Sequence, residues 1–294
     1  MSPSFSPEGH VVALEARKLM KLSEAVVLLE REIAEVDKLF QDIPDEQWRQ
    51  ATVSQGWTVA DQLGHLVWTD QLCLSAIDND ERFQQVVALT QGSDPEAFTK
   101  HLDAEAHRLA EQEPAELLNQ WTTTHHELLT RLKEYGDDQE TKIAWLARPM
   151  SPTSMAQART MELWAHSLDI YDAVGWTKPR NEAEASVAEL AVKTRDFAFT
   201  LHGHTPPQEP IYVQLSLQVG PDLSFGDPDA ENRVIGSAWG FCAVVTQRRH
   251  FADADLNIEG DTAKLWMQIA QAFAGAATTG PEPGERLSPA DLED

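Results

Sequence analysis

Residues 156–173 read AQARTMELWAHSLDIYDA, and their spacing predicts one amphipathic helix. Leu163 and Trp164 contribute to its apolar face, and Glu162 and His166 stand among the apolar positions, four residues apart. On a helix, two residues with this separation lie one above the other on the same face. A carboxylate and an imidazole placed in this way form half of a divalent-metal site. An ordinary surface pair on a helical bundle has the same spacing, so this stretch alone leaves both interpretations open.

A second stretch, residues 56–70, favours the metal interpretation. It reads GWTVADQLGHLVWTD, in which Thr58 and Asp61 have the spacing of a helix-capping pair. His65 lies beside the predicted buried stripe of this helix rather than opposite it. Burying imidazoles and a carboxylate without partners is unfavourable, and coordination of a cation removes that penalty. Together the two helices predict a metal site with two histidines and one carboxylate.

The predicted metal ligands are His65, Glu162 and His166. Three protein ligands leave coordination positions open for water, a substrate or a thiol, which is the pattern of a catalytic zinc site. The same donors also suit Fe(II), so the identity of the divalent metal stays open. Asp169 follows one turn later and is either a hydrogen-bond acceptor for His166 or a solvent-exposed helix residue, and we expect the latter.

A net charge of −25 over 294 residues decides which partners are excluded. Negative charge repels polyphosphate backbones and anionic lipid surfaces, so we expect neither a nucleic acid nor a membrane as a partner. A small anionic substrate would meet the same repulsion and would need a local cationic group to hold it. Hydrophobic residues make up 42% of the chain, which is typical of globular rather than disordered proteins.

The two cysteines, Cys73 and Cys242, lie far apart in apolar runs and outside any zinc-binding spacing. We expect buried, inert thiols and a reducing, cytoplasmic location. The first ten residues lack the basic and apolar segments of a signal peptide, and no run of about 18 apolar residues is present to span a membrane. The expected partner is a small-molecule substrate, and the expected assembly is a monomer or a small homo-oligomer.

Apolar periodicity divides the chain into two domains and a tail. Residues 12–178 show the patterns of an up-down helix bundle, and residues 179–277 mix the strand and helix patterns of a small α+β domain. Residues 278–294 are rich in Pro, Gly and acidic residues, which predicts a disordered acidic tail. The expected helices are 14–39, 58–77, 95–112, 114–135, 154–173, 182–201, 237–249 and 262–273, and the expected strands are 210–217, 223–225, 234–235 and 256–258.

The run GWTVADQLGHL resembles the N-terminal signature of the mycothiol-dependent maleylpyruvate isomerase family, within the DinB-like metal-binding superfamily. In that family the His of the signature is a metal ligand, and here it is His65. A second family motif has a Glu and a His four apart on the last bundle helix, usually with an Arg upstream and an Asp downstream. Here these residues are Arg159, Glu162, His166 and Asp169. The resemblance implies a DinB-like bundle followed by a small, sterol-carrier-like α+β domain.

The resemblance also implies a catalytic arginine in the C-terminal domain. The family ends a helix there with Thr-Gly-Arg, and this Arg is needed for activity. The nearest match is Thr246-Gln247-Arg248, followed by a second arginine, so Arg248 and Arg249 are both catalytic candidates. The alternative is an arginine pair that only complements the dipole at a helix C-terminus. Residues 54–55, Ser-Gln, also replace the Cys-Pro of the N-terminal signature.

These motifs predict an enzyme that uses a divalent metal, with zinc as the expected ion, to activate mycothiol or another low-molecular-weight thiol. The thiolate would add to a small electrophile, as in an isomerase or an S-transferase. One of the two arginines would hold a substrate carboxylate or a developing enolate. Three alternatives stay open: a non-catalytic, metal-containing protein that binds a small molecule, a metal-dependent enzyme that uses no thiol, and a helical structural protein without metal.

Overall fold

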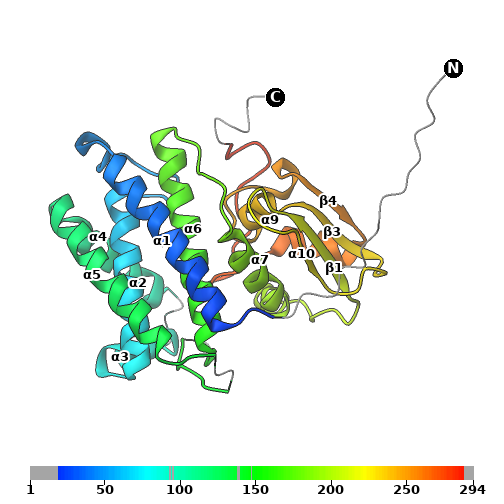
Figure 1. Ribbon diagram of the computed structural model, residues 1–294, viewed down its shortest axis with the longest axis horizontal. Helices are drawn as coiled ribbons and strands as arrows, with labels where there is room; N and C mark the ends of the chain where they lie inside the picture. Colours follow the sequence, from blue (N-terminus) through cyan, green and yellow to red (C-terminus); the bar gives the residue numbers. More distant parts are fainter. Residues whose placement is uncertain (1–18, 93, 95, 138–139, 147, 288–294) are drawn as a thin grey trace.

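The computed structural model describes residues 19–287 except 93, 95, 138, 139 and 147. Figure 1 shows a bundle of long helices on one side and a small sheet with short helices on the other. This arrangement confirms the predicted fold class, a helix bundle followed by an α+β unit. None of the helices in the described part of the chain is both long enough and apolar enough to cross a lipid bilayer.

The bundle contains the five helices that the periodicity predicts and one more. Its elements are α1 (Leu22–Asp42), a 3-10 turn η1 (Asp45–Gln47), α2 (Val59–Asp78), α3 (Glu81–Thr90), α4 (Ala97–Ala110), α5 (Pro114–Lys133) and α6 (Pro152–Val174). Helix α3 was not expected, because residues 78–81, Asp-Asn-Asp-Glu, have the composition of a loop. In the structure Asp80 caps this helix by accepting a hydrogen bond from Phe83 N at 3.0 Å.

Helix α2 begins where the capping pair predicts. Thr58 N donates to Asp61 Oδ2 at 2.7 Å, and Asp61 N donates to Thr58 Oγ1 at 3.4 Å. These reciprocal bonds satisfy two backbone donors at the helix start. The cap fixes the register of α2 and therefore the face on which His65, two turns later, is presented.

The C-terminal unit is a four-stranded mixed sheet with helices packed on it (Figure 1). The strands lie in the order β2-β1-β3-β4; β1 and β3 are parallel and the outer pairings are antiparallel. The predicted helix 182–201 is divided at Thr194 into two helices. The elements are α7 (Glu184–Lys193), α8 (Arg195–Leu201), β1 (Ile211–Ser216), β2 (Leu223–Phe225), β3 (Asn232–Ser237), α9 (Ala238–Val245), η2 (Phe251–Asp253), β4 (Leu256–Glu259) and α10 (Asp261–Ile269).

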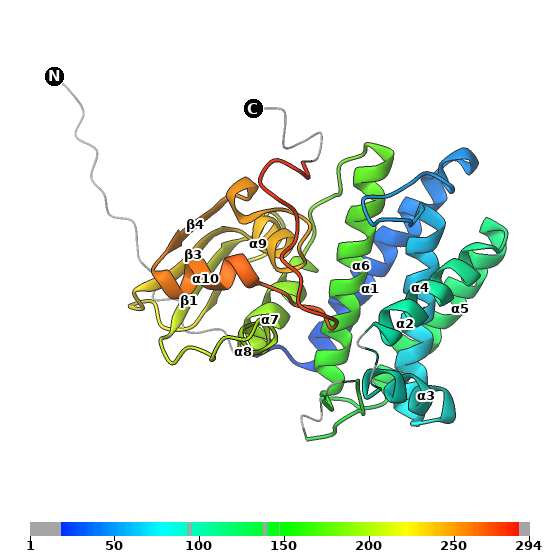
Figure 2. The same ribbon diagram turned by 180° about the vertical axis from the view of Figure 1, so that it is seen from behind.

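Helix α6 lies between the bundle and the C-terminal unit, as the two opposite views in Figures 1 and 2 show. Met155 and Leu163 belong to the apolar core of the bundle, whereas Trp164 and Leu168 belong to the core of the C-terminal unit. A helix that is apolar around its whole circumference is buried on all sides. Residues 156–173 of α6 therefore contribute side chains to both cores.

The first ten residues of the predicted acidic tail are described in the structure, and they lie against the protein. Thr278 Oγ1 donates to Gln247 Oε1 at 2.6 Å, and Gly284 N donates to Asp253 Oδ2 at 2.7 Å. Arg286 forms ion pairs with Asp169 and Asp172 of α6. For residues 278–287 this differs from the expectation of disorder, which composition alone suggested, because one arginine pairs with two buried carboxylates. Residues 288–294 lie outside the described part.

A buried ion pair joins α6 and the following segment to α1. Lys178 Nζ lies 2.6 Å from Glu32 Oε1 and donates to Ser167 Oγ at 2.8 Å. Asn181 Nδ2 donates to the other carboxylate oxygen of Glu32 at 2.9 Å. Both charged side chains are fully buried. Charges in such a place are tolerated only when paired and hydrogen-bonded.

Replacing Lys178 with Met is expected to lower the free energy of unfolding by about 3–5 kcal/mol, because Glu32 is left buried without its cation. The double variant Lys178→Met, Glu32→Leu should recover most of this loss. The control Lys133→Met breaks an exposed ion pair between Lys133 of α5 and Glu30, which lies on α1 as Glu32 does. It should change the free energy of unfolding by less than about 1 kcal/mol. Urea unfolding measures all three; a double variant no more stable than Lys178→Met would contradict the assignment.

Candidate metal centre

Helices α2 and α6 lie side by side and run in opposite directions. Three side-chain contacts join them, and as the residue number rises along α2 it falls along α6: Gln62 with His166, His65 with Glu162, and Asp70 with Arg159. Each contact buries polar atoms between the two helices. The antiparallel packing therefore brings the motif of residues 56–70 onto the motif of residues 159–169.

The structure brings the three predicted metal ligands together. The Nε2 atoms of His65 and His166 lie 3.1 Å and 3.3 Å from the same oxygen, Oε2 of Glu162. One donor atom from each residue lies within 4.8 Å of the other two. Two imidazole nitrogens and a carboxylate oxygen that converge on one point are a donor set that zinc and Fe(II) both accept. These residues fit a divalent cation, although their role as ligands stays a prediction.

Burial sets the protonation states that coordination needs. Burial, assisted by the neighbouring His166 imidazole, lowers the pKa of His65 to about 4. Burial alone would raise the pKa of Glu162, but hydrogen bonds with His166 and His65 hold it well below its usual value. At neutral pH the His65 ring is therefore uncharged and Glu162 is ionised. Coordination of a metal ion uses the uncharged imidazole and the ionised carboxylate.

Gln62, which sequence analysis did not single out, orients one of the ligands. His166 Nδ1 donates to Gln62 Oε1 at 2.5 Å, which leaves Nε2 of that ring toward Glu162. The Gln62 amide is fixed in turn, since its Nε2 donates to Thr52 Oγ1 at 2.9 Å and to Ser54 Oγ at 3.2 Å. Hydrogen bonds of this kind select the tautomer and orientation of metal-binding histidines. The available signal was spacing, because residue 62 lies one turn before His65 on the same helix face.

Trp57 covers the centre on the side of the capping turn. Its ring centroid lies 5.3 Å from that of His65 and 6.1 Å from that of His166. The Trp57 side chain is itself buried and excludes solvent from both imidazoles. The GWT signature thus has two local roles here, an aromatic cover and the helix cap that follows it.

Asp169 is not the solvent-exposed residue that we expected. Its exposed fraction is 1%, and its carboxylate pairs with Arg248 and Arg286. Helix α6 has no solvent face at this position because the C-terminal unit packs there. Asp169 Oδ2 is 3.9 Å from His166 Nδ1, which is too long for a hydrogen bond, so Gln62 takes the acceptor role.

The two candidate catalytic arginines lie beside α6 in ion pairs. Arg248 Nη2 lies 2.8 Å from Asp169 Oδ2, and the two terminal nitrogens of Arg249 each lie 2.9 Å from an oxygen of Asp172. The side chain of Arg249 is 1% exposed and that of Arg248 is 13% exposed. Arg248 therefore contacts Asp169, which follows His166 by three residues on α6. Arg249 is buried against Asp172, which lies one turn further along the same helix. A catalytic role for either arginine stays a prediction.

The backbone at Gln247 supports the alignment of this segment with the Thr-Gly-Arg motif. Helix α9 ends at Val245, and Gln247 then has a φ of 60°, in the left-handed region that favours glycine. A residue in this conformation commonly ends a helix. A glycine would adopt this conformation readily at position 247, which is where the resemblance places the Gly of the family pattern. Which of Arg248 and Arg249 corresponds to the family arginine stays a prediction.

His65 and Glu162 also form the inner wall of a cavity of about 450 Å³ between the bundle and the C-terminal unit. Cys73 lines this cavity, but burial raises the pKa of its thiol to about 12. This thiol is therefore protonated at neutral pH and is a poor nucleophile, as the sequence suggested. Neither Arg248 nor Arg249 is among the described residues that line the cavity.

The segment that contains all three converging side chains, residues 29–171, matches the family model of the mycothiol maleylpyruvate isomerase N-terminal domain. The uncharacterized proteins Rv0036c and MT0041 of two Mycobacterium tuberculosis strains are each 42% identical to the chain over 247 residues. This match covers 84% of the chain and 94% of each relative. The chain belongs to the family of the mycothiol maleylpyruvate isomerase N-terminal domain.

Two solved structures are similar to the chain over both of its parts. The crystal structure of the mycothiol-dependent maleylpyruvate isomerase matches with a TM-score of 0.53 at 16% identity, and that of a mutant of the enzyme with 0.55 at 15%. Each match covers 89% of this chain and 97% of the other. At this level of identity the likeness shows a shared fold, a helix bundle joined to an α+β unit.

Replacing Gln62 with Leu is expected to weaken zinc binding about 10-fold to 100-fold, because His166 loses the acceptor that orients its ring. The control Gln71→Leu removes an amide on the same helix that accepts from Arg82 and has no contact with the three candidate ligands, and it should bind zinc like the wild type. Competition with a chromogenic chelator measures both affinities. Equal affinities of the two variants would contradict the orienting role.

The metal-free protein is expected to lose stability as pH falls from about 6.5 to about 4, since unfolded His65 takes up a proton in this range while folded His65 resists it. At pH values above about 6.5 the free energy of unfolding contains the full contribution of His65, about 3 kcal/mol, and this contribution is lost as the pH falls to about 4. A His65→Leu variant should therefore show a smaller decrease over the same interval. Denaturant unfolding at a series of pH values checks this; parallel curves for both proteins would contradict it.

Proposed function

We propose that this chain is a divalent-metal-dependent enzyme that activates a low-molecular-weight thiol, such as mycothiol, for addition to a small electrophile. The observation that supports this proposal is the convergence of His65, Glu162 and His166, the first two of which line a cavity. Three protein donors with room beside them are typical of catalytic rather than structural zinc sites. Membership of the family, whose solved member depends on mycothiol, supports the choice of thiol.

In this proposal the chain's own residues prepare the site before a thiol arrives. His65 and His166 offer their Nε2 atoms and Glu162 offers one oxygen, while Gln62 keeps the His166 ring in the required tautomer. Trp57 excludes water from the imidazole side. A bound zinc ion would lower the pKa of a coordinated thiol and so supply a thiolate at neutral pH.

The proposed reaction is the addition of a thiol S–H across an activated double bond. Sulfur bonds to one carbon of the former double bond and the proton is delivered to the other, leaving a single bond that can rotate. Loss of the same thiol after rotation regenerates the double bond with inverted geometry, which is an isomerisation. Retention of the thiol gives an S-transferase product. The residues described here are compatible with both outcomes.

Arg248 is the arginine that we propose to assist the site. Its partner Asp169 lies one turn beyond His166 on α6, and the side chain of Arg248 is more exposed than that of Arg249. Its ion pair with Asp169 places a positive charge beside the centre in a chain whose net charge is −25. For Arg249, which lies in a bidentate pair with Asp172, we propose a structural role.

Elemental analysis and a thiol-dependence assay test the proposed function together. The purified wild-type protein, reconstituted with zinc, should hold about one equivalent of metal. It should turn over at least one of a panel of activated alkenes only when mycothiol or a surrogate thiol is added. A His65→Ala variant should keep its far-ultraviolet circular dichroism, lose the metal and lose this turnover, because an open site is not the main support of the fold.

The alternatives give different results in the same experiments. Turnover that is equal with and without thiol would favour a metal-dependent enzyme that uses no thiol. Bound metal with no thiol affinity, measured by calorimetry on the zinc-loaded protein, would favour a non-catalytic binding protein. Less than about a tenth of an equivalent of any transition metal after reconstitution would contradict the metal site itself.

A further inference from the structure

The cavity beside the candidate metal centre is larger and more apolar than a small, highly charged substrate needs. Its volume of about 450 Å³ lies within the range of cavities that enclose drug-sized ligands. Its walls come from α2, α4, α6, α7, α8, the connector between α5 and α6, and the segment after α10. Large apolar side chains dominate these walls, and they include Trp68, Leu72, Phe98, Trp145, Met155 and Phe197. An apolar ligand would gain free energy by displacing water from such walls.

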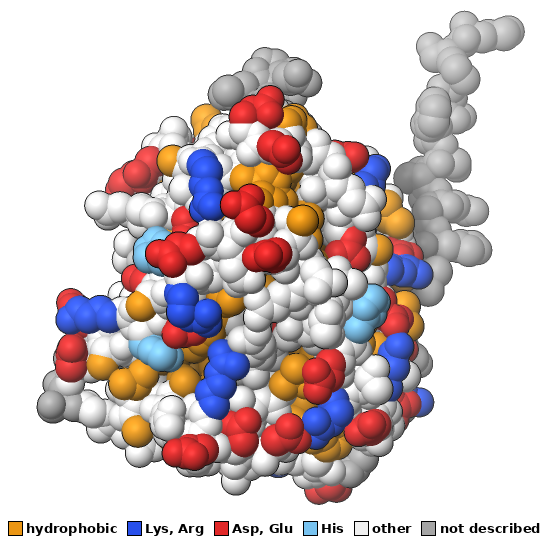
Figure 3. All heavy atoms as spheres, turned by 90° about the vertical axis from the view of Figure 1, so that its left-hand side faces the viewer, with side chains coloured by type: hydrophobic (Ala, Val, Ile, Leu, Met, Phe, Trp, Pro, Cys, Tyr) orange, Lys and Arg blue, Asp and Glu red, His pale blue; other side chains and the backbone are white. Residues whose placement is uncertain are grey.

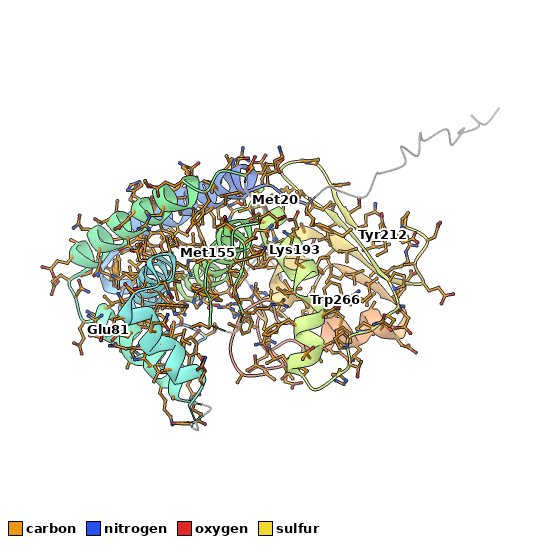
Figure 4. All side chains as sticks on the ribbon, turned by 90° about the horizontal axis from the view of Figure 1, so that it is seen from below. Met20, Glu81, Met155, Lys193, Tyr212 and Trp266 are labelled. Atoms are coloured by element: carbon orange, nitrogen blue, oxygen red, sulfur yellow. The ribbon has the colours of Figure 1, made fainter. Side chains whose placement is uncertain are left out.

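The cavity is lined by successive turns of α2 and α6, and His65 and Glu162 of the candidate metal centre lie at one end of these two lined segments. On α6 it is lined from Ser151 to Glu162, and on α2 from His65 to Cys73. At a helical rise of 1.5 Å per residue these segments are roughly 16 Å and 12 Å long. Because the two helices are antiparallel, Ser151 and Cys73 both lie at the end that is remote from Glu162 and His65. Figure 4 labels Met155 on α6 and Lys193 on α7, two lining residues from opposite sides of the seam between the bundle and the C-terminal unit.

The charged groups on the wall are mainly cations. Lys142, Arg148, Arg159 and Lys193 line the cavity, whereas Glu162 is the acidic residue among the described lining residues. This is opposite in sign to the chain as a whole, whose net charge is −25. Figure 3 shows acidic and basic side chains interspersed over the outer face of the bundle, with the acidic ones more numerous.

The cations differ in whether a ligand could use them. Arg159 is buried and held by Asp70 at 2.7 Å, and Lys193 is held by Glu189 at 2.7 Å. Arg148 is exposed in the connector before α6 and makes neither a hydrogen bond nor an ion pair with any described residue. It lies three residues before Ser151, at the end of the cavity remote from Glu162. A carboxylate at this end would meet an arginine that has no competing partner among the described residues.

We infer that the cavity binds an elongated apolar monocarboxylate, with its carboxylate at Arg148 and its far end against His65 and Glu162. A chain of about eight to ten carbons matches a length of roughly 12 Å, since each C–C bond is near 1.5 Å and the chain is staggered. The placement of a reactive, electrophilic carbon at the far end rests on the proposed function. The binding of an apolar acid does not, because it depends on the walls and on Arg148 alone.

Calorimetry on the full chain, stripped of metal by a chelator and free of thiol, tests this inference with decanoate as the probe. Decanoate should bind saturably and quench the fluorescence of Trp68 and Trp145 on the wall. Affinity should fall by at most about fourfold for each methylene removed toward hexanoate. Decanol, which lacks the charge, and maleate, which lacks the chain, should both bind more weakly than decanoate. Failure of the metal or thiol experiments would leave this result unaffected.

Two variants locate the ligand. Arg148→Gln should weaken decanoate binding about twofold to fivefold without changing decanol binding. The control Arg233→Gln removes a half-buried arginine of the C-terminal unit that donates to Pro228 O and is not among the cavity-lining residues, so it should change neither. Ala158→Phe adds a ring to the wall one turn from Glu162, so it should reduce decanoate binding more than hexanoate binding. Circular dichroism confirms that each variant is folded.

Three results would overturn the inference. Equal affinity for decanoate and decanol, together with no effect of Arg148→Gln, would show that no carboxylate is recognised. Maleate binding as tightly as decanoate would show that the site selects small dianions. The absence of saturable binding by every probe would show that the cavity does not admit an apolar chain.

Discussion

Helix α6 is buried on every side, and this constraint organises the rest of the molecule. One set of its apolar side chains completes the core of the bundle, and another set completes the core of the C-terminal unit. Any displacement of α6 would open both cores at once. The position and rotation of this helix are therefore fixed by several layers of packing, which is what a precisely oriented set of ligands requires.

A helix with no solvent face must find partners for each of its polar side chains within the protein. Gln157 donates to Glu189 of α7 at 2.9 Å, Arg159 pairs with Asp70 of α2, and Asp169 pairs with Arg248 after α9. Glu162 differs, because its neighbours are two imidazoles rather than a permanent cation. The vicinity of Glu162 is thus the part of α6 where an external cation completes the pairing that the rest of the helix achieves internally.

The ligand set could be predicted because helix geometry is local. The four-residue spacing of Glu162 and His166 and the Thr58–Asp61 cap each fix a helix face without reference to distant residues. Burial of Asp169 could not be predicted in this way, because it depends on the C-terminal unit packing against α6. The same holds for the cavity. Arg148 lies in a connector without periodicity, so its position beside α6 is set by tertiary packing.

Composition was an incomplete guide to the C-terminal segment. Pro, Gly and acidic residues predicted disorder, yet residues 278–287 lie along the protein and Arg286 joins Asp169 and Asp172. The average composition of this segment does not reveal that Arg286 can form ion pairs with α6. Here Arg248 and Arg249 each pair with one of two buried carboxylates, and Arg286 adds a third arginine that contacts both.

The contact of Arg286 with α6 has a consequence for the order of events during synthesis. Bundles can begin to fold while later residues are still being translated. Asp169 and Asp172, however, acquire their third arginine only when residue 286 has been synthesised and has left the ribosome exit tunnel. The nascent protein therefore passes through a stage in which these two carboxylates pair with Arg248 and Arg249 alone, and the ion pairs with Arg286 form later.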